Sequence, residues 1–114
     1  MTTTDRTALA RASYAAFAAG DRDAVEGLLH HDLVFSAPPD VGIDRAAWFD
    51  RCWPGAGTLT GFAFVRLREI PGDEVLVTYE CTRADGTRFR NTEILGFDGD
   101  RIRTIEVYFG WDLD

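Results

Sequence analysis

The chain has no excess of positive charge, no long hydrophobic run and little cysteine. Its 114 residues carry a net charge of −7, which argues against a nucleic-acid partner because a phosphate backbone requires a basic surface. The same charge argues against binding to an anionic membrane surface, and no run approaches the length of a transmembrane helix. We therefore expect a soluble protein with neither a nucleic-acid nor a membrane partner.

The small number of cysteines and the absence of certain short motifs exclude further classes of protein. Cys52 and Cys81 have neither the spacing of a metal site nor the number needed for a disulfide framework, and residues 1–6 lack the apolar segment of a signal peptide. These features predict a cytoplasmic protein in which Cys81 is a small buried residue of a strand. The sequence has no glycine-rich phosphate loop, nucleophile elbow or zinc signature, so we expect no cofactor and no metal.

Hydrophobic residues are nevertheless sufficient for one folded domain over residues 1–114, since they make up 46% of the chain. Hydrophobic spacing and capping residues predict three helices, at about 6–19, 22–30 and 45–53. Alternation and turn sequences predict five strands, at 33–37, 61–70, 74–83, 88–97 and 101–110. The last four strands form an antiparallel meander, and this grouping of helices and strands is typical of an α+β fold.

Polar residues on one strand face indicate a pocket. In the strand predicted at 88–97, Asn91 and Glu93 share the face of Phe89, Leu95 and Phe97, because alternate residues of a strand point the same way. A carboxylate on an apolar face is costly unless something uses or satisfies it. The pattern therefore predicts a small-molecule site between the sheet and the helices.

The order of elements carries a family resemblance. With Ala19-Gly20-Asp21 between the first two helices and Tyr108-Phe109-Gly110 closing the last strand, the chain resembles the nuclear transport factor 2-like superfamily, and its SnoaL-like branch most closely. The resemblance implies a conical α+β fold, in which three N-terminal helices pack on a curved, mostly antiparallel sheet with a pocket at the open end. It also implies a homodimer joined through the outer sheet face, which would bury Ile94, Thr104, Glu106 and Tyr108.

The chain has matching residues at only some of the catalytic positions that the resemblance implies. Ketosteroid isomerases of this superfamily place a base aspartate at the end of the first strand, a tyrosine on the first helix and a protonated aspartate on the next-to-last strand. The match puts Ala37, Ser13 and Glu93 at these positions, with Tyr14 beside Ser13. Limonene epoxide hydrolases place an aspartate where this chain has Val107. The resemblance thus implies one of the three isomerase roles, that of Glu93.

Glu93 and Tyr14 are the expected catalytic residues. Apolar surroundings would raise the pKa of Glu93 and so favour proton exchange with a ligand; the alternative is a buried glutamate that Asn91, Tyr14 or a helix group satisfies. Asp40 is a further possible base at the rim, or an ordinary loop residue. The expected substrate-binding residues are Phe17, Phe35, Trp48, Trp53, Tyr79, Asn91, Val107 and Phe109, although the two tryptophans and the tyrosines also suit a core.

Two charged features have structural interpretations. His30 and His31 should end the second helix, where a cation suits the helix dipole and adjacent residues do not share a face, so a surface or capping role is expected. Glu106 should form a cross-strand pair with Arg90 on the outer face.

Two hypotheses for function follow. The first is a cofactor-free enzyme that isomerises, cyclises or dehydrates a small, mostly apolar, carbonyl-bearing molecule by acid–base chemistry. The second is a non-catalytic module of the same fold that binds an apolar ligand or dimerises, which the apolar residues Ala37 and Val107 favour.

Overall fold

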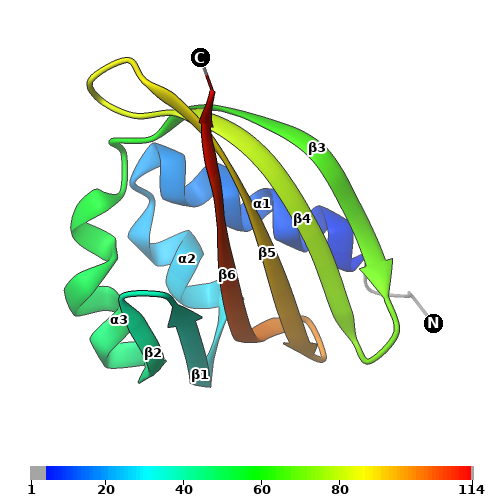
Figure 1. The fold of residues 1–114 in the computed structure, drawn as a ribbon. Helices are drawn as coiled ribbons and strands as arrows, with labels where there is room; N and C mark the ends of the chain where they lie inside the picture. The colour runs from blue at the N-terminus through cyan, green and yellow to red at the C-terminus, as the bar shows by residue number, and fades with distance from the viewer. Residues whose placement is uncertain (1–4, 114) are drawn as a thin grey trace.

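The computed structural model describes residues 5–113, and within them it contains three α-helices, one short 3-10 helix and a six-stranded sheet (Figure 1). Residues 1–4 and 114 lie outside the described part, so most of the segment considered above as a signal peptide lies outside it too. No helix within residues 5–113 is both long and apolar enough to cross a membrane.

Aspartate caps begin the three α-helices. These are α1 (Arg6–Ala19), α2 (Arg22–Leu28) and α3 (Arg45–Arg51). The side chains of Asp5, Asp21 and Asp44 each accept a hydrogen bond from the backbone N–H three residues further on, which satisfies a donor that the first turn leaves free. Gly20 ends α1 in the left-handed conformation, with φ of 69°.

The strands form one sheet in the order β2-β1-β6-β5-β4-β3. Their bounds are β1 Leu29–Ala37, β2 Asp40–Asp44, β3 Thr60–Ile70, β4 Glu74–Thr82, β5 Arg88–Asp98 and β6 Arg101–Leu113. The four long strands are consecutive antiparallel neighbours, which confirms the predicted meander, and β1 joins β6 in parallel. The result is the α+β fold with a mostly antiparallel sheet that the sequence predicts.

Several predicted elements differ from those of the structure. The second helix ends at Leu28, because Leu29 is extended and buried where β1 pairs with β6. The short strand β2 was missed, since Pro38 and Pro39 were interpreted as the end of the strand region, whereas they form the turn of a β1–β2 hairpin. Helix α3 stops at Arg51, and Trp53–Gly55 form the 3-10 helix η1 around Pro54, because a proline disfavours α-helix at the residue before it.

The core lies between the sheet and the helices, and Figure 1 shows the long strands β3 and β4 bending across α1. Alternate residues of the strands point into this layer, and Cys81 is fully buried there, as expected. A cluster of aromatic rings lies around α3. In it, Phe17, Trp48, Phe49 and Trp53 pack together at centroid distances of 4.9–6.3 Å. Aromatic residues thus supply much of the buried surface.

The two sides of β6 differ toward its end. Pairing with β1 reaches Ser36 and Glu106, while pairing with β5 continues to Leu113. Residues 107–113 therefore have a neighbouring strand on one side within the described chain. This arrangement leaves Val107 and Phe109 beside the open region between β1 and the helices.

The predicted pair of Glu106 with Arg90 is wrong. Arg90 lies opposite Glu80 of β4 and donates to its carboxylate, with Nε 3.0 Å from Oε2. Glu106 lies opposite Ile94 and accepts the hydroxyl of Tyr108. The difference comes from strand register, which the sequence did not determine.

Candidate functional site

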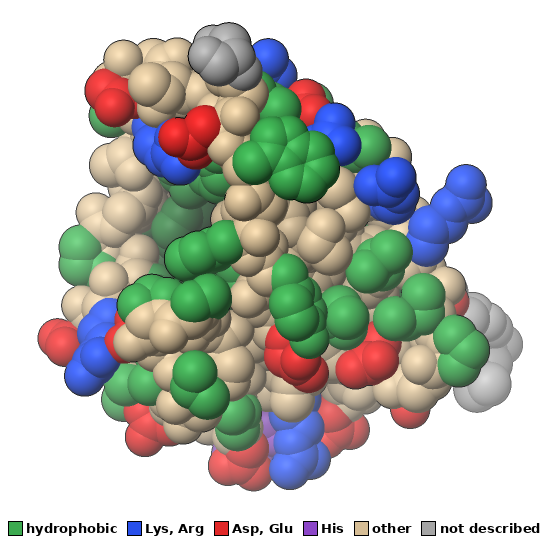
Figure 2. Space-filling model, in the orientation of Figure 1, with side chains coloured by type: hydrophobic (Ala, Val, Ile, Leu, Met, Phe, Trp, Pro, Cys, Tyr) green, Lys and Arg blue, Asp and Glu red, His purple; other side chains and the backbone are tan. Residues whose placement is uncertain are grey.

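A cavity of about 300 Å³ lies between the inner face of the sheet and the helices. In the space-filling view, hydrophobic side chains are visible inside a hollow of the surface between the α3 region and β6 (Figure 2). The wall is almost entirely apolar, and its aromatic members other than the tyrosines come from α1, β1, α3, β3 and β6: Phe17, Phe35, Trp48, Phe62 and Phe109. A concave apolar space with few polar groups is the usual form of a small-molecule site.

Glu93 is the polar centre of this cavity. Oε1 of Glu93 accepts a hydrogen bond of 3.0 Å from the Tyr14 hydroxyl, and Oε2 accepts one of 2.7 Å from the Tyr79 hydroxyl. All three side chains line the cavity. The site thus contains a carboxyl group held on both oxygens by tyrosines, and we refer to Tyr14, Glu93 and Tyr79 as the Tyr–Glu–Tyr network.

The sequence produces this network through two periodicities. Tyr14 follows Ala10 by four residues on the buried face of α1, so it points at the sheet. Tyr79 of β4 pairs with Asn91, and Val77 pairs with Glu93 of β5, so Tyr79 is the diagonal neighbour of Glu93 on the inner face. Phe62 holds both tyrosine rings, at centroid distances of 5.7 and 5.2 Å.

Burial determines the protonation of the network. Loss of solvent raises the pKa of Glu93 above its usual 4.5, and the two tyrosine hydrogen bonds offset this only in part. Burial, and then the nearby charge of Glu93, also raise the pKa values of Tyr14 and Tyr79. Both tyrosines therefore keep their protons, and the carboxyl group is the member of the network that titrates.

Counting protons shows what each state offers to a ligand. With Glu93 ionised, the network has two hydroxyl protons, and both are used in its two internal hydrogen bonds. With Glu93 neutral, three protons serve two internal hydrogen bonds, so one proton is left to donate into the cavity. A ligand oxygen next to the network can accept this proton, which makes the neutral form a hydrogen-bond donor or an acid.

Most of the expected site residues meet at this cavity. Glu93, Tyr14, Phe17, Phe35, Trp48, Tyr79, Val107 and Phe109 line it. Ser13 and Ala37 also do, but the Ser13 hydroxyl donates to the carbonyl oxygen of Ala10 at 2.7 Å. Ser13 therefore does not replace a tyrosine donor.

Two expected substrate-binding residues lie outside the cavity wall. Trp53 packs behind it, with its ring against Phe17, Trp48 and Phe49. Asn91 lies at an irregularity in the pairing of β5 with β6, where its Oδ1 accepts the N–H of Gly110 at 3.2 Å. Strand parity gave the correct face for Asn91, but it could not locate the bulge.

Sequence reasoning missed other wall residues. Phe62 was identifiable from its alternation with Phe64 in β3, and Cys52 from its helical spacing with Trp48 and Phe49, but Leu59 lies in an irregular segment that carries no periodic signal. Burial, followed by the charges of Asp40 and Glu93, raises the pKa of the Cys52 thiol to about 11. Cys52 is therefore a neutral thiol in this wall rather than a nucleophile.

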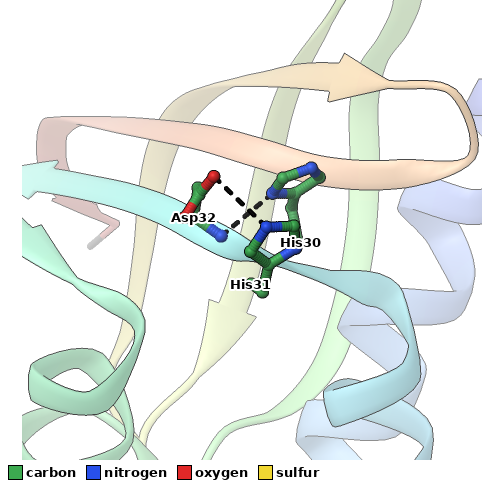
Figure 3. Close-up of side chains that lie close together, drawn as sticks. All are labelled: His30, His31 and Asp32. Atoms are coloured by element: carbon green, nitrogen blue, oxygen red, sulfur yellow. Dashed lines mark hydrogen bonds and ion pairs between the residues drawn. The ribbon is translucent and has the colours of Figure 1, made fainter.

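The prediction that His30 and His31 end the second helix is wrong. Both residues lie in β1 (Figure 3). The pairing of β1 with β6 shifts between Leu29 and Val34, and this irregularity stacks the two imidazoles at 4.3 Å with Asp32 beside them. Potential ligand atoms of the three residues lie within 4.8 Å of one another. However, His30 already accepts the N–H of Asp32 through Nδ1, and its Nε2 lies 3.2 Å from Asp98, so both nitrogens have partners within the protein.

Comparison with known proteins identifies the family. The SnoaL-like domain matches residues 10–105, which is most of the chain, so the chain belongs to the SnoaL-like family. This family is a branch of the nuclear transport factor 2-like superfamily, as expected from the order of elements. No curated protein matches the chain.

Solved structures share this fold. A proposed ketosteroid isomerase from Kribbella flavida has a TM-score of 0.77 at 22% identity, over 100% of this chain and 84% of that chain. A proposed polyketide cyclase from Pseudomonas putida has a TM-score of 0.71 at 17% identity, over 95% of this chain and 93% of that one. A nuclear transport factor 2-like protein of unknown function from Cytophaga hutchinsonii has a TM-score of 0.77 at 16% identity, over 96% and 95% of the two chains. At these identities the likeness establishes the fold alone.

Replacing Glu93 with glutamine is expected to change how stability depends on pH. The folded state holds the Glu93 proton more tightly than the unfolded chain, so it binds more protons between the usual pKa of 4.5 and the raised pKa. The unfolding free energy of the wild type should therefore fall, relative to that of Glu93→Gln, as pH rises through this window. Urea denaturation over a pH series measures the difference.

The exposed Glu69→Gln is the matched control for that series, because Glu69 lies outside the cavity wall. Its difference from the wild type should lack the trend expected for Glu93→Gln. A wild type that gains stability relative to Glu93→Gln with rising pH would contradict the raised pKa.

Proposed function

We propose that this protein is a cofactor-free acid–base enzyme for a small, mostly apolar, carbonyl-bearing molecule, which it isomerises, cyclises or dehydrates. The observation that carries the proposal is the Tyr–Glu–Tyr network in a wall that is otherwise nearly apolar. A carboxyl group with a raised pKa that can donate outward is suited to a carbonyl oxygen. A purely structural glutamate would not need an open space beside it.

The size of the cavity limits the ligand. Its volume of about 300 Å³ corresponds to about ten water molecules at about 30 Å³ each. This suits a compact molecule of one or two rings. In this proposal the sheet and its helical cover form a cone, and the ligand enters at the open end beside Phe109, whose side chain is strongly exposed.

The proposed chemistry follows from the spare proton. A ligand carbonyl oxygen accepts it, and the hydrogen bond strengthens as the oxygen gains negative charge during formation of an enol. Because the surrounding wall is nearly apolar, this interaction is stronger than in bulk solvent. Removal of one such acid or hydrogen-bond donor typically lowers a rate by about 100-fold to 10,000-fold.

The binding module remains the second candidate, and a specific observation favours it. Ala37 and Val107 both line the cavity, so the positions that carry carboxylates in the isomerases and epoxide hydrolases are apolar here. In a binding module, neutral Glu93 would orient a ligand oxygen without a subsequent reaction. Turnover of an enolisable ligand distinguishes the two functions.

Exchange of acidic C–H protons tests the enzymatic proposal. With the bicyclic ketone 2-tetralone in D₂O, the wild type should accelerate exchange at the carbons next to the carbonyl group, as followed by proton NMR. Glu93→Gln should lower this exchange by about 100-fold or more. It should retain binding of 2-naphthol, a mimic of the enol, measured by calorimetry.

Unchanged exchange in Glu93→Gln would contradict the role of Glu93. A wild type that binds 2-naphthol but does not accelerate the exchange would instead support the binding module. Glu69→Gln again serves as the control, since its side chain is exposed on β3.

We also infer a homodimer through the outer sheet face. The support is the exposure of apolar side chains there, including Val34 and Tyr108 at 45% and 51%. Ile94 and Thr104 lie on the adjoining strands of the same face, as a dimer interface would require. Sedimentation velocity at micromolar concentration should give twice the mass of the chain; a monomer at that concentration would contradict the inference.

A further inference from the structure

Two adjacent histidines lie on the same side of β1, although neighbouring residues of a regular strand point to opposite faces. The imidazole rings of His30 and His31 are stacked, with centroids 4.3 Å apart and planes 23° from parallel. Both residues lie within the irregularity in the pairing of β1 with β6, between Leu29 and Val34. Strand alternation in the sequence therefore could not predict that the two rings meet.

Asp32 completes a group of three possible metal ligands (Figure 3). One nitrogen of each imidazole and one oxygen of the Asp32 carboxylate lie within 4.8 Å of one another. Nε2 of His31 is 3.3 Å from Oδ2 of Asp32. A tetrahedral zinc ion, with bonds of about 2.0–2.1 Å, holds neighbouring ligand atoms about 3.3 Å apart. This pair of atoms therefore already has the separation that one ion requires.

The remaining adjustment falls on two surface side chains. The side chains of His31 and Asp32 are 82% and 60% exposed, whereas that of His30 is 12% exposed. His30 is thus the fixed member of the group. Rotation of the two exposed side chains toward it brings all three ligand atoms to one ion without a change in the core.

His30 also has the surroundings of a metal-bound histidine. Its Nε2 lies 3.2 Å from Oδ2 of Asp98, the last residue of β5. A histidine that binds a metal usually donates its other ring N–H to a carboxylate, which orients the ring. Its Nδ1 accepts the backbone N–H of Asp32 at 2.9 Å, so this nitrogen presents the lone pair that an ion would take. Because Asp32 is exposed, water can accept the N–H that the ion displaces.

The donor atoms favour a transition metal over magnesium or calcium. Imidazole nitrogen is a ligand for zinc, nickel and copper, whereas magnesium and calcium prefer oxygen ligands alone. The net charge of −7 favours the approach of any cation. Arg103 lies 3.8 Å from Asp98, but both side chains are exposed, and a surface ion pair of this kind contributes little.

We propose that His30, His31 and Asp32 form a zinc site, in which Asp98 orients the ring of His30. Among residues 5–113, none of these four side chains lines the cavity, so the site does not depend on the proposed function. The three ligands belong to β1 and Asp98 to β5, and β6 lies between these strands in the sheet. Zinc therefore links two segments across a third strand, and it stabilises the folded state in proportion to its occupancy.

Calorimetric titration with zinc chloride tests the site in protein without a histidine tag. The wild type should bind one equivalent of zinc, and zinc should raise the midpoint of its thermal unfolding. His31→Gln and Asp32→Asn should each abolish both effects, because each removes a ligand at an exposed position that the fold tolerates. Asp98→Asn should lower the zinc affinity by about 10-fold to 100-fold.

Asp100→Asn is the matched control, since Asp100 is an exposed acidic residue of the turn that follows β5. It should bind zinc as the wild type does. Unchanged zinc affinity in His31→Gln and Asp32→Asn would overturn the site, as would loss of binding in Cys52→Ser, which would assign the ion to a thiol. Magnesium that displaces zinc at equal concentration would show only general attraction of cations to an acidic surface, and it would overturn the site too.

Discussion

The protein depends on one interaction, in which the hydroxyls of Tyr14 and Tyr79 hold the partly buried carboxyl group of Glu93 in the wall of an apolar cavity. A carboxylate with little access to solvent and no cation beside it is costly, and two hydrogen bonds compensate for only part of that cost. The carboxyl group responds by holding its proton more tightly. The poor solvation that disfavours the charged form of Glu93 thus keeps its carboxyl group protonated to higher pH, and the neutral group can donate a hydrogen bond to a ligand oxygen.

The fold supplies what this interaction needs. Helix α1 places Tyr14 against the inner face of the sheet. Strands β4 and β5 place Tyr79 and Glu93 as diagonal neighbours on that face. The shorter strand β1 stops level with the middle of β6, so the space beside the network stays open instead of being filled by another strand. A rigid aromatic layer around the tyrosines keeps their hydroxyl groups in place.

Periodic features of the sequence predicted much of this and irregular ones did not. Alternation within β5 placed Glu93 on the inner face, and helical spacing placed Tyr14 opposite it, so the two catalytic candidates meet as expected. Three features depend on register: the β2 hairpin, the irregularity of β1 at His30 and His31, and the bulge that places Asn91 beside Gly110. The pairing of Arg90 with Glu80 has the same origin. Register is fixed by contacts between distant segments, and alternation within one strand carries no information about it.

The protonation of Glu93 is the central claim, and its titration tests it most directly. Carbon-13 NMR can follow the side-chain carboxyl carbon of Glu93 in labelled protein, with the signal assigned by its absence from Glu93→Gln. The account predicts a titration midpoint above 4.5, the usual pKa of glutamic acid, while exposed glutamates such as Glu69 serve as the internal reference. A midpoint at or below 4.5 would mean that the tyrosine hydrogen bonds outweigh burial, and it would contradict the account.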